Sequence, residues 1–358
     1  MEEQNFISQL VDIVHSDLVF TDLMIEENAP VMAKGPSGWE PVESIPFVGR
    51  DDMEEILKNL DSDWENTLAE RAINRPLDLS EWRLRVNAYL AFGGSKLMMS
   101  IRKMPTRPLP LKDTGLPASV RLMIDNPKGL ILVAGATGSG KSTSLAAMAD
   151  AINESRNAHI ITIEDPIEYL FVRKKSIFSQ REIGVDVGSF FEGVRDAMRQ
   201  RPDVIVIGEI RDKETAETAL LAAESGHLVI GTLHANSAPW VIQKLLAFFP
   251  SHEREARLQT LASTLVGVIA QILLPAEDKS GYVLAPEMLF NHKQQFSKVL
   301  GDPEKIQTLL ERKEDSVSRA MVDVLVDLVA AKRVSKVEAL RSITLGQSAL
   351  YEKLKSVA

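Results

Sequence analysis

Continuous apolar runs recur along the second two-thirds of the chain. They stand at Gly129–Ala134, His159–Ile163, Val204–Ile207 and Leu228–Leu233, and helix-like stretches separate them. A strand that is buried on both faces of a parallel sheet has this character, because helices cover both faces. The alternation therefore predicts a doubly wound α/β domain.

The first third of the chain has a more mixed pattern. Apolar residues recur at helical spacing between Phe6 and Val14, which predicts an amphipathic opening helix that packs on its own domain. The turn residues Gly35–Gly38 predict a hairpin between Leu23–Ile25 and Trp39–Val42. Two further strands are expected at Trp82–Tyr89 and Lys96–Arg102.

Three prolines fall within Met104–Lys112 and disfavour both a helix and a central strand. We place a linker at residues 104–112, a smaller α+β domain at 1–103 and the α/β domain at 113–358. The end of the chain reads as helical, with Ser335–Glu338 as a capping box.

Composition narrows the class of protein. The 358 residues carry a net charge of -9, which argues against nucleic acid as a partner. The absence of cysteine excludes disulfides and thiolate metal sites. Glu2 and Glu3 do not fit a signal peptide, and the most apolar run, Leu265–Leu274, is too short to span a membrane. We expect a cytoplasmic protein that reaches a membrane only through a partner.

The strongest chemical signal is Gly135–Ser142, which satisfies the phosphate-loop pattern G-x-x-x-x-G-K-[ST]. A buried strand precedes it and a helix-forming run follows, which disfavours the alternative of a glycine-rich turn with an incidental lysine. The glycines aim backbone N–H groups at phosphate oxygens, Lys141 supplies a charge, and the Ser142 hydroxyl can ligate Mg²⁺. The predicted ATP contacts are Gly135, Ala136, Thr137, Gly138, Ser139, Gly140, Lys141, Ser142 and Thr143.

Carboxylates follow two other predicted strands, at the edge of the sheet where ligands bind. Glu164–Glu168 holds three of them, with Pro166 turning the chain, and one can polarise the attacking water. A solvated acidic turn is the alternative. We count Glu164 among the nucleotide contacts. Glu209 follows the run Val204–Ile207 after one glycine, which is where a Walker-B acid that reaches Mg²⁺ stands. Asp203 stands at the other end of that strand, away from the ligand, and suits a local cap.

Two histidines bracket the strand Leu228–Leu233. Their odd separation places His227 and His234 on opposite faces and at opposite ends, so a shared metal is not expected. His234, at the carboxyl end, can contact the γ-phosphate. His227 is either functional or a structural hydrogen-bonding residue.

Together these segments resemble the pilus-retraction (twitching-motility) ATPases of the type II/IV secretion superfamily. The resemblance is carried by four boxes in order, a Walker A, an Asp box, an atypical Walker B and a His box, with further matching segments. These segments are Arg85–Ala88, Met104–Pro105, Gly135–Thr143, Thr162–Glu168, Ser179–Gly184, Gly208–Asp212 and Gly226–Ala235.

The resemblance implies a PAS-like domain followed by a RecA-like domain, assembled as a homohexamer. It makes Glu168 the catalytic base, Glu209 the Walker-B acid and His234 a γ-phosphate contact. It also aligns four arginines with nucleotide contacts, some of them acting across a subunit boundary: Arg85, Arg102, Arg195 and Arg211. For Arg102 and Arg195 a surface salt bridge stays an open alternative. The implied partner is a polytopic inner-membrane platform protein beneath a pilus, with a second related ATPase as a further candidate.

Two departures from the family pattern stand out. The family's Ser-Asp-Leu-His segment is Thr21–Met24 here, and no Ala-Ile-Arg box occurs between Phe290 and Ser318. The lack of cysteine excludes the four-cysteine zinc module of assembly ATPases. Two alternatives remain: a motor of a conjugation or type IV secretion apparatus (DotB or TraJ type), or a non-hydrolysing nucleotide-binding regulator.

Overall fold

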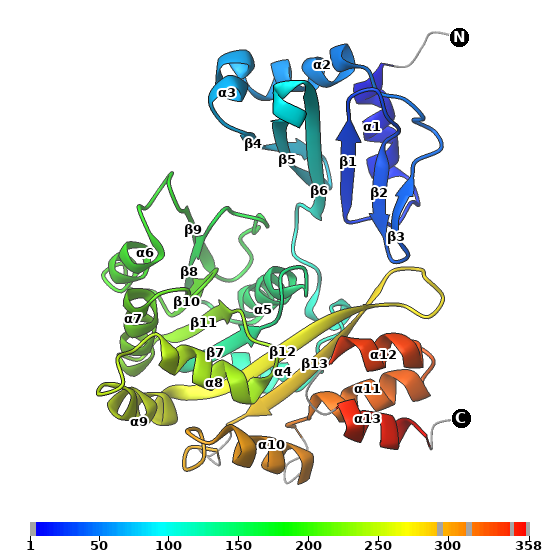
Figure 1. Cartoon of the computed structure of the whole chain (residues 1–358). Helices are drawn as coiled ribbons and strands as arrows, with labels where there is room; N and C mark the ends of the chain where they lie inside the picture. The colour runs from blue at the N-terminus through cyan, green and yellow to red at the C-terminus, as the bar shows by residue number, and fades with distance from the viewer. Residues whose placement is uncertain (1–4, 292–295, 313–316, 344–346, 356–358) are drawn as a thin grey trace. The chain divides into compact units, whose positions relative to one another are not determined.

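The computed structural model describes residues 5–291, 296–312, 317–343 and 347–355. The chain divides into two compact units (Figure 1). The first comprises Met1–Arg107 with Asp278–Tyr282, and the second comprises Pro108–Glu277 with Val283–Ala358. The division after Arg107 falls within the proline-rich segment 104–112.

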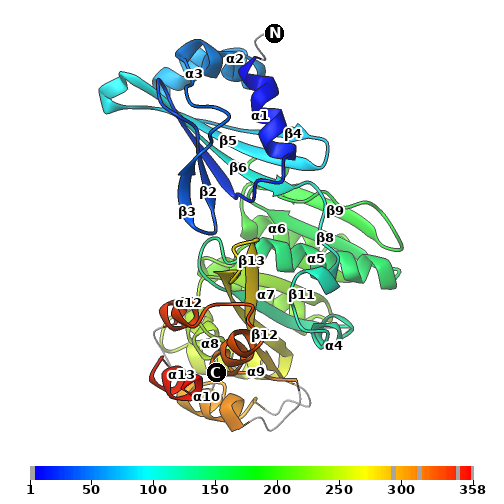
Figure 2. The ribbon, with the colours of Figure 1, turned by 90° about the vertical axis from the view of Figure 1, so that its right-hand side faces the viewer.

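The first unit is an antiparallel sheet with helices on one face (Figure 2). Its strand order is β3-β2-β1-β6-β5-β4. Alternate side chains of β5 and β6, such as Val86 and Met99, are fully buried against α1, α2 and α3. The elements are α1 (Phe6–His15), β1 (Asp22–Glu26), β2 (Met32–Gly35), β3 (Gly38–Pro41), α2 (Arg50–Leu60), α3 (Trp64–Glu70), β4 (Ile73–Leu79), β5 (Trp82–Ala91), η1 (Phe92–Gly94) and β6 (Lys96–Pro105).

Helix α1 begins where expected, because the Asn5 side chain accepts a hydrogen bond from the Ser8 amide at 2.9 Å. The hairpin prediction was wrong in its pairing. The turn at Gly35–Gly38 joins β2 to β3, whereas β1 pairs with β2 and β6. An extra reversal between Glu26 and Met32 adds the strand β2, whose short Met-Ala-Lys-Gly sequence gives no clear two-residue alternation.

Strand β6 also runs further than expected. It continues through Met104 and Pro105, two residues that the sequence placed in the linker. Pro105 is the last residue of the strand and lies opposite Trp82 in the register. A strand end tolerates proline because the missing N–H interrupts no continuing ladder.

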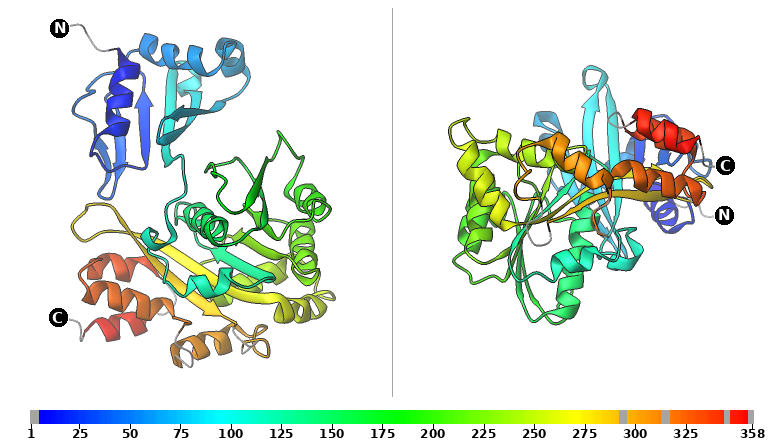
Figure 3. Two further views of the ribbon diagram at one scale, coloured as in Figure 1. Left: turned by 180° about the vertical axis from the view of Figure 1, so that it is seen from behind. Right: turned by 90° about the horizontal axis from the view of Figure 1, so that it is seen from below.

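The second unit is the predicted α/β domain, and its mainly parallel sheet has the order β13-β12-β7-β11-β10-β8-β9. Strands β12 and β13 form a long hairpin (Figure 3). The elements are η2 (Leu111–Asp113), α4 (Val120–Ile124), β7 (Gly129–Ala134), α5 (Lys141–Ser155), β8 (His159–Glu164), β9 (Ile177–Glu182), α6 (Phe190–Ala197), β10 (Val204–Ile207), α7 (Lys213–Glu224), β11 (Leu228–Leu233), α8 (Ala238–Ala247), α9 (Arg254–Thr264), β12 (Leu265–Pro275), β13 (Tyr282–Phe290), α10 (Pro303–Arg312), α11 (Met321–Ala330), α12 (Lys336–Ser342) and α13 (Gln347–Leu354).

The apolar runs are continuous because each strand contributes side chains to two hydrophobic cores, one on each face of the sheet. In β7, Leu130 and Leu132 pack on the side of α6 to α9, while Ile131 and Val133 pack on the side of α4 and α5. Side chains in a strand alternate between faces, so every side chain of a strand that is covered on both sides is buried in an apolar core. The fold class predicted from the sequence is confirmed.

A helical end of the chain packs beside the β12–β13 hairpin, where Leu274 and Val283 share a core with α11 to α13 (Figure 3). Ser335 caps α12 by accepting a hydrogen bond from the Glu338 amide at 3.2 Å. The segment in which the Ala-Ile-Arg box was sought includes α10, but residues 292–295 and 313–316 lie outside the described part. Among the residues described, no helix is both long enough and apolar enough to cross a membrane.

A buried carboxylate joins two helices of this unit. Glu287 of β13 is 1% exposed and accepts hydrogen bonds from the backbone amides of Ala238 and Met321. These residues begin α8 and α11, neither of which receives a side-chain hydrogen bond from its own N-cap residue. Glu287 therefore satisfies amides that helix geometry leaves unpaired at both helix starts.

Candidate functional site

The phosphate loop connects β7 to α5. Gly138 and Gly140 have φ of 79° and 83°, a conformation that favours glycine. Gly135 is required by close packing as well, since a Cβ there would lie 2.3 Å from Ser139 Oγ and 2.5 Å from the backbone oxygen of Gln271. Ala136 and Thr137 are exposed at the tip. Helix α5 begins at Lys141, so its unpaired N-terminal amides face the loop.

The side chain of Lys141 lies over the loop that precedes it. Its Nζ donates to the backbone oxygens of Gly135 and Ala136, each at 2.9 Å. Burial lowers the pKa of Lys141, and the negative charges of Glu209 and Glu168 act in the opposite direction. The two predicted catalytic carboxylates are thus close enough to Lys141 to act on its charge.

The acidic segment follows β8, as predicted. The carboxylate of Glu164 accepts hydrogen bonds from Thr162 Oγ1 at 2.7 Å and Gln180 Nε2 at 3.3 Å. Burial raises the pKa of Glu164, and these two hydrogen bonds oppose that rise. Hydrogen bonds from β8 and β9 thus hold the Glu164 carboxylate at the end of β8. Glu168, beyond Pro166, instead acts electrostatically on Lys141.

Tyr169 ties this segment to the first turn of α5. Its hydroxyl lies 2.8 Å from Thr143 Oγ1, and its side chain is almost fully buried. Burial raises the pKa of Tyr169 to about 12, so the phenol stays protonated at neutral pH. The hydroxyl of Thr143, a predicted nucleotide contact, is engaged by this tyrosine, while Ser142 is exposed.

Glu209 and His234 meet beyond the ends of β10 and β11. His234 Nε2 lies 3.2 Å from Glu209 Oε1. The chain around Glu209 is anchored to β11, because Thr232 Oγ1 donates to the Gly208 oxygen and the Ile210 amide donates to the Thr232 oxygen at 2.8 Å. The backbone on both sides of Glu209, the predicted Walker-B acid, is thus bonded to β11.

His227 and Asp203 lie at the other end of the sheet. His227 Nδ1 is 2.9 Å from the Ala222 oxygen, a structural contact between α7 and β11. Asp203 accepts a hydrogen bond from the His159 amide at 2.8 Å and links β10 to β8, which is the local role expected of it.

The predicted arginines fall into two groups. In the second unit, Arg211 lies 3.5 Å from Asp165 and over the Phe190 ring, whereas Arg195 lies over its neighbour Phe191 at 5.1 Å. The other two arginines belong to the first unit. Arg85 and Arg102 are exposed and directly opposed in the β5–β6 register, and Arg102 Nε donates to Asp22 Oδ1 at 2.9 Å.

Four predicted residues therefore gather at one edge of the sheet: Lys141, Glu168, Glu209 and His234. They follow β7, β8, β10 and β11, which are neighbours in the strand order β7-β11-β10-β8. The supporting residues Tyr169 and Gln180 were missed by sequence reasoning. Tyr169 adjoins the acidic segment, but its partner Thr143 is 26 residues away in the chain, so no local pattern indicates the contact.

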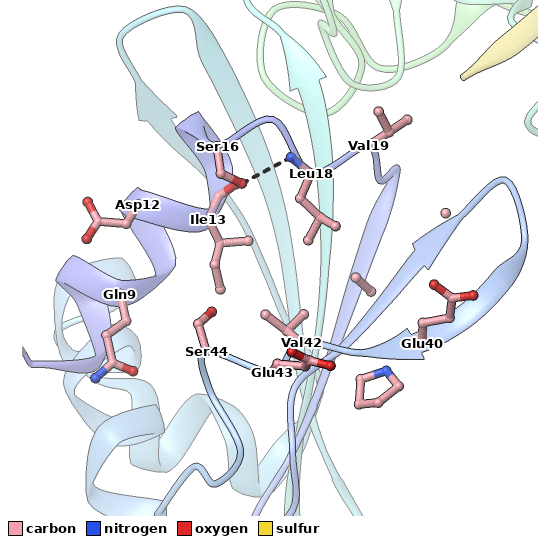
Figure 4. Close-up of a pocket in the computed structure, with 13 residues that line it drawn as sticks. Gln9, Asp12, Ile13, Ser16, Leu18, Val19, Glu40, Val42, Glu43 and Ser44 are labelled. Carbon is pink, nitrogen blue, oxygen red and sulfur yellow. Dashed lines mark hydrogen bonds between the residues drawn. The ribbon is translucent and has the colours of Figure 1, made fainter. Parts of the chain in front are cut away.

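An open pocket of about 620 Å³ lies in the first unit, between α1 and the β2–β3 hairpin (Figure 4). Its wall includes the carboxylates of Asp12, Glu40 and Glu43, with Leu18 and Val19 at one side. None of the residues predicted to bind ATP lines it. An acidic wall repels phosphate, so this pocket does not suit a nucleotide.

Comparison with known proteins gives consistent matches. The family described as type II/IV secretion system protein matches residues 72–313. The Pseudomonas aeruginosa type IV pilus retraction ATPase PilT is 44% identical over 192 residues, which cover 54% of this chain and 55% of that protein. The match thus spans about half the length of that relative.

Among the solved structures that match nearly the whole chain are the following two. A crystal structure of the pilus retraction motor PilT with bound ADP has a TM-score of 0.79 and 33% identity, and covers 95% of this chain and 98% of that one. The Legionella pneumophila ATPase DotB has a TM-score of 0.83 and 25% identity, and covers 93% of this chain and 94% of that one.

Proposed function

This chain belongs to the type II/IV secretion system protein family and is a PilT-like ATPase, and we propose that it works as a hexameric motor that retracts a type IV pilus. The observation that carries the proposal is the gathering of Lys141, Glu168, Glu209 and His234 around the phosphate loop. A protein that only binds nucleotide needs the loop and its lysine. The carboxylates and the histidine add groups suited to hydrolysis.

Each side chain has a role set by its place. The N-terminal amides of α5 and the Lys141 ammonium bind the β- and γ-phosphates of ATP. Glu168 accepts a hydrogen bond from the attacking water and holds it in line with the γ-phosphorus. His234 contacts the γ-phosphate on one side and Glu209 on the other. Loss of the phosphate therefore changes the contacts of His234 and, through it, those of the Walker-B segment.

The residues present also fit Mg²⁺. Ser142 offers an exposed hydroxyl on the first turn of α5, and Glu209 offers a carboxylate beside Lys141. Oxygen donors of this kind suit a hard divalent cation, which would neutralise charge that develops on the phosphates. Because Oε1 of Glu209 faces His234, its second oxygen would be the one to ligate the cation.

Arg211 and Arg195 lie on the same unit as the phosphate loop and would contact nucleotide phosphates. Arg85 and Arg102 would act from a neighbouring subunit, which makes hydrolysis depend on ring assembly. The motor docks at the cytoplasmic face of the inner membrane by binding a polytopic pilus platform protein, alone or together with a second related ATPase.

A second candidate is a motor of a type IV secretion or conjugation apparatus. The observation that favours it is the higher TM-score of the DotB structure, 0.83 against 0.79 for the pilus motor. Binding of the purified ring to the cytoplasmic part of a pilus platform protein separates the two, since a secretion motor has no reason to bind it.

The test is steady-state ATP hydrolysis by the full chain, with its mass determined in solution at the same concentration. We expect a Mg²⁺-dependent hexamer whose turnover falls at least about a hundredfold in Lys141→Ala, Glu168→Gln and Glu209→Gln, and vanishes with EDTA. Glu214→Gln, an exposed carboxylate on α7, is the matched control and should keep full activity. Full turnover by Lys141→Ala or Glu209→Gln would refute the site, and an inactive, well-folded hexamer would favour a regulator.

A further inference from the structure

A buried glutamine on β12 contacts the phosphate loop. Gln271 is 1% exposed, and its Nε2 donates to the Ser139 backbone oxygen at 2.7 Å. The same residue fills the space beside two loop glycines. A Cβ at Gly135 would lie 2.5 Å from the Gln271 oxygen, and one at Gly140 would lie 3.3 Å from its Nε2. The loop is thus built against this residue.

The contact fixes the direction of one peptide group. In a trans peptide the C=O and N–H bonds point in opposite directions, so the Gly140 N–H points away from Gln271 when the Ser139 oxygen points toward it. Gly140 precedes the first residue of α5, and its amide belongs to the donors that line a phosphate loop. Gln271 also turns a carbonyl oxygen, which would repel phosphate, away from the anion.

Stability gives a poor account of an amide at this position. Within the part of the chain that the structure describes, Gln271 Oε1 and Ser139 Oγ are both buried and without a hydrogen-bond partner. A buried unpaired polar atom costs about as much as, or more than, one hydrogen bond contributes. An apolar side chain of the same length would remove the unpaired Oε1 and leave the Ser139 oxygen unpaired instead, so the two costs are comparable. The amide is therefore explained by what its nitrogen does to the loop.

We infer that Gln271 is a positioning residue for phosphate binding, which holds the Ser139–Gly140 peptide with its N–H toward the nucleotide. The inference rests on the proposed nucleotide site at Lys141. It adds a residue from β12, 132 positions away from Ser139 in the chain, to the machinery of the loop.

The test compares two replacements of Gln271 in the full chain. Gln271→Met keeps the length and removes the donor, and we expect ADP to bind about tenfold more weakly by calorimetry. KM for ATP should rise by a similar factor, while kcat stays within about threefold, because the hydrolytic groups are untouched. Gln271→Glu places a negative charge against the Ser139 oxygen and should weaken binding on the order of a hundredfold.

A matched control separates positioning from fold stability. Asn291 is also a buried amide, and its Nδ2 donates to the Leu265 oxygen at the start of β12, away from the loop. We expect Asn291→Ala to lower the unfolding temperature without changing the affinity for ADP. We expect Gln271→Met to weaken ADP binding without lowering the unfolding temperature. Equal weakening of ADP binding by both variants would overturn the inference.

Lys141→Ala separates a failure of the proposed nucleotide site from a failure of the inference about Gln271. If Lys141→Ala binds ADP poorly and Gln271→Met binds it within twofold of the parent, the nucleotide site stands and the inference about Gln271 is wrong. If Lys141→Ala keeps the parental affinity, the proposed site itself is wrong and the inference falls with it. In the Lys141→Ala background the Gln271→Met effect should shrink, because both act on the same phosphates.

Discussion

Replacing Glu287 by glutamine should remove a pH dependence from the stability of the second unit. Burial raises the pKa of Glu287 from 4.5 to about 7, against the hydrogen bonds from the Ala238 and Met321 amides, while the charge of Glu311 adds to the rise. The folded chain therefore prefers the protonated carboxyl, although two helix starts lie against it.

The sign and size of the effect follow from linkage. Below pH 4.5 the Glu287 carboxyl is protonated in both states, so its contribution to stability is fully present there. As the pH rises toward about 7, the unfolded chain ionises first and the contribution is lost. The interval between the two pKa values corresponds to about 3 kcal/mol. Glutamine stays neutral, so Glu287→Gln should gain about that much relative to the parent between pH 4.5 and pH 8.

The assay is urea-induced unfolding followed by circular dichroism at several pH values from 5 to 8, with parent and variant compared at each pH. Other titrating groups then cancel, since they are common to both chains. Glu277→Gln, an exposed carboxylate just beyond β12, is the control and should show a constant difference. A constant difference for Glu287→Gln as well would refute the reasoning, and would mean that the two helix N-termini stabilise the ionised carboxylate.

Two further outcomes are expected. Gly135→Ala should abolish ATP binding while the chain still folds, because the new methyl group meets Ser139 Oγ at 2.3 Å and displaces the loop; nucleotide titration and circular dichroism check both halves, and parental affinity would contradict the packing argument. Arg102→Ala should lower turnover of the assembled ring several-fold and leave nucleotide affinity of isolated subunits unchanged. Loss of binding in the isolated subunit would instead assign Arg102 to its own subunit's site.

The parts of the site that lie at strand ends could be predicted from sequence. A parallel sheet brings the carboxyl ends of its strands to one edge, so the residues after four apolar runs had to meet there. This placed Lys141, Glu209, His234 and the acidic segment Glu164–Glu168 at that edge without knowledge of the strand order. The choice of Glu168 within the segment came from the family resemblance. The identity of β9 was less accessible, because Ile177–Glu182 pairs at the edge of the sheet and carries polar, partly buried residues.

Contacts between distant segments could not be predicted in this way. In the sequence, Gln271 is only a polar residue inside the apolar run Leu265–Leu274. Its hydrogen bond to Ser139 depends on β12 lying beside β7. The double cap by Glu287 likewise depends on two helix starts meeting one strand. The predicted pairing of Leu23–Ile25 with Trp39–Val42 was wrong for a similar reason, since hydrophobic pattern alone does not choose between neighbouring partners.

The place of β7 in the sheet has a consequence for how the chain is made. This strand carries the phosphate loop, yet both its partners come much later: β11 begins at Leu228 and β12 at Leu265. At ~5–20 residues per second, a ribosome needs several seconds or more after Ala134 before either partner has emerged. Through that interval an entirely apolar strand has no neighbour on either side, and we expect it to be the segment of the nascent chain that chaperones hold.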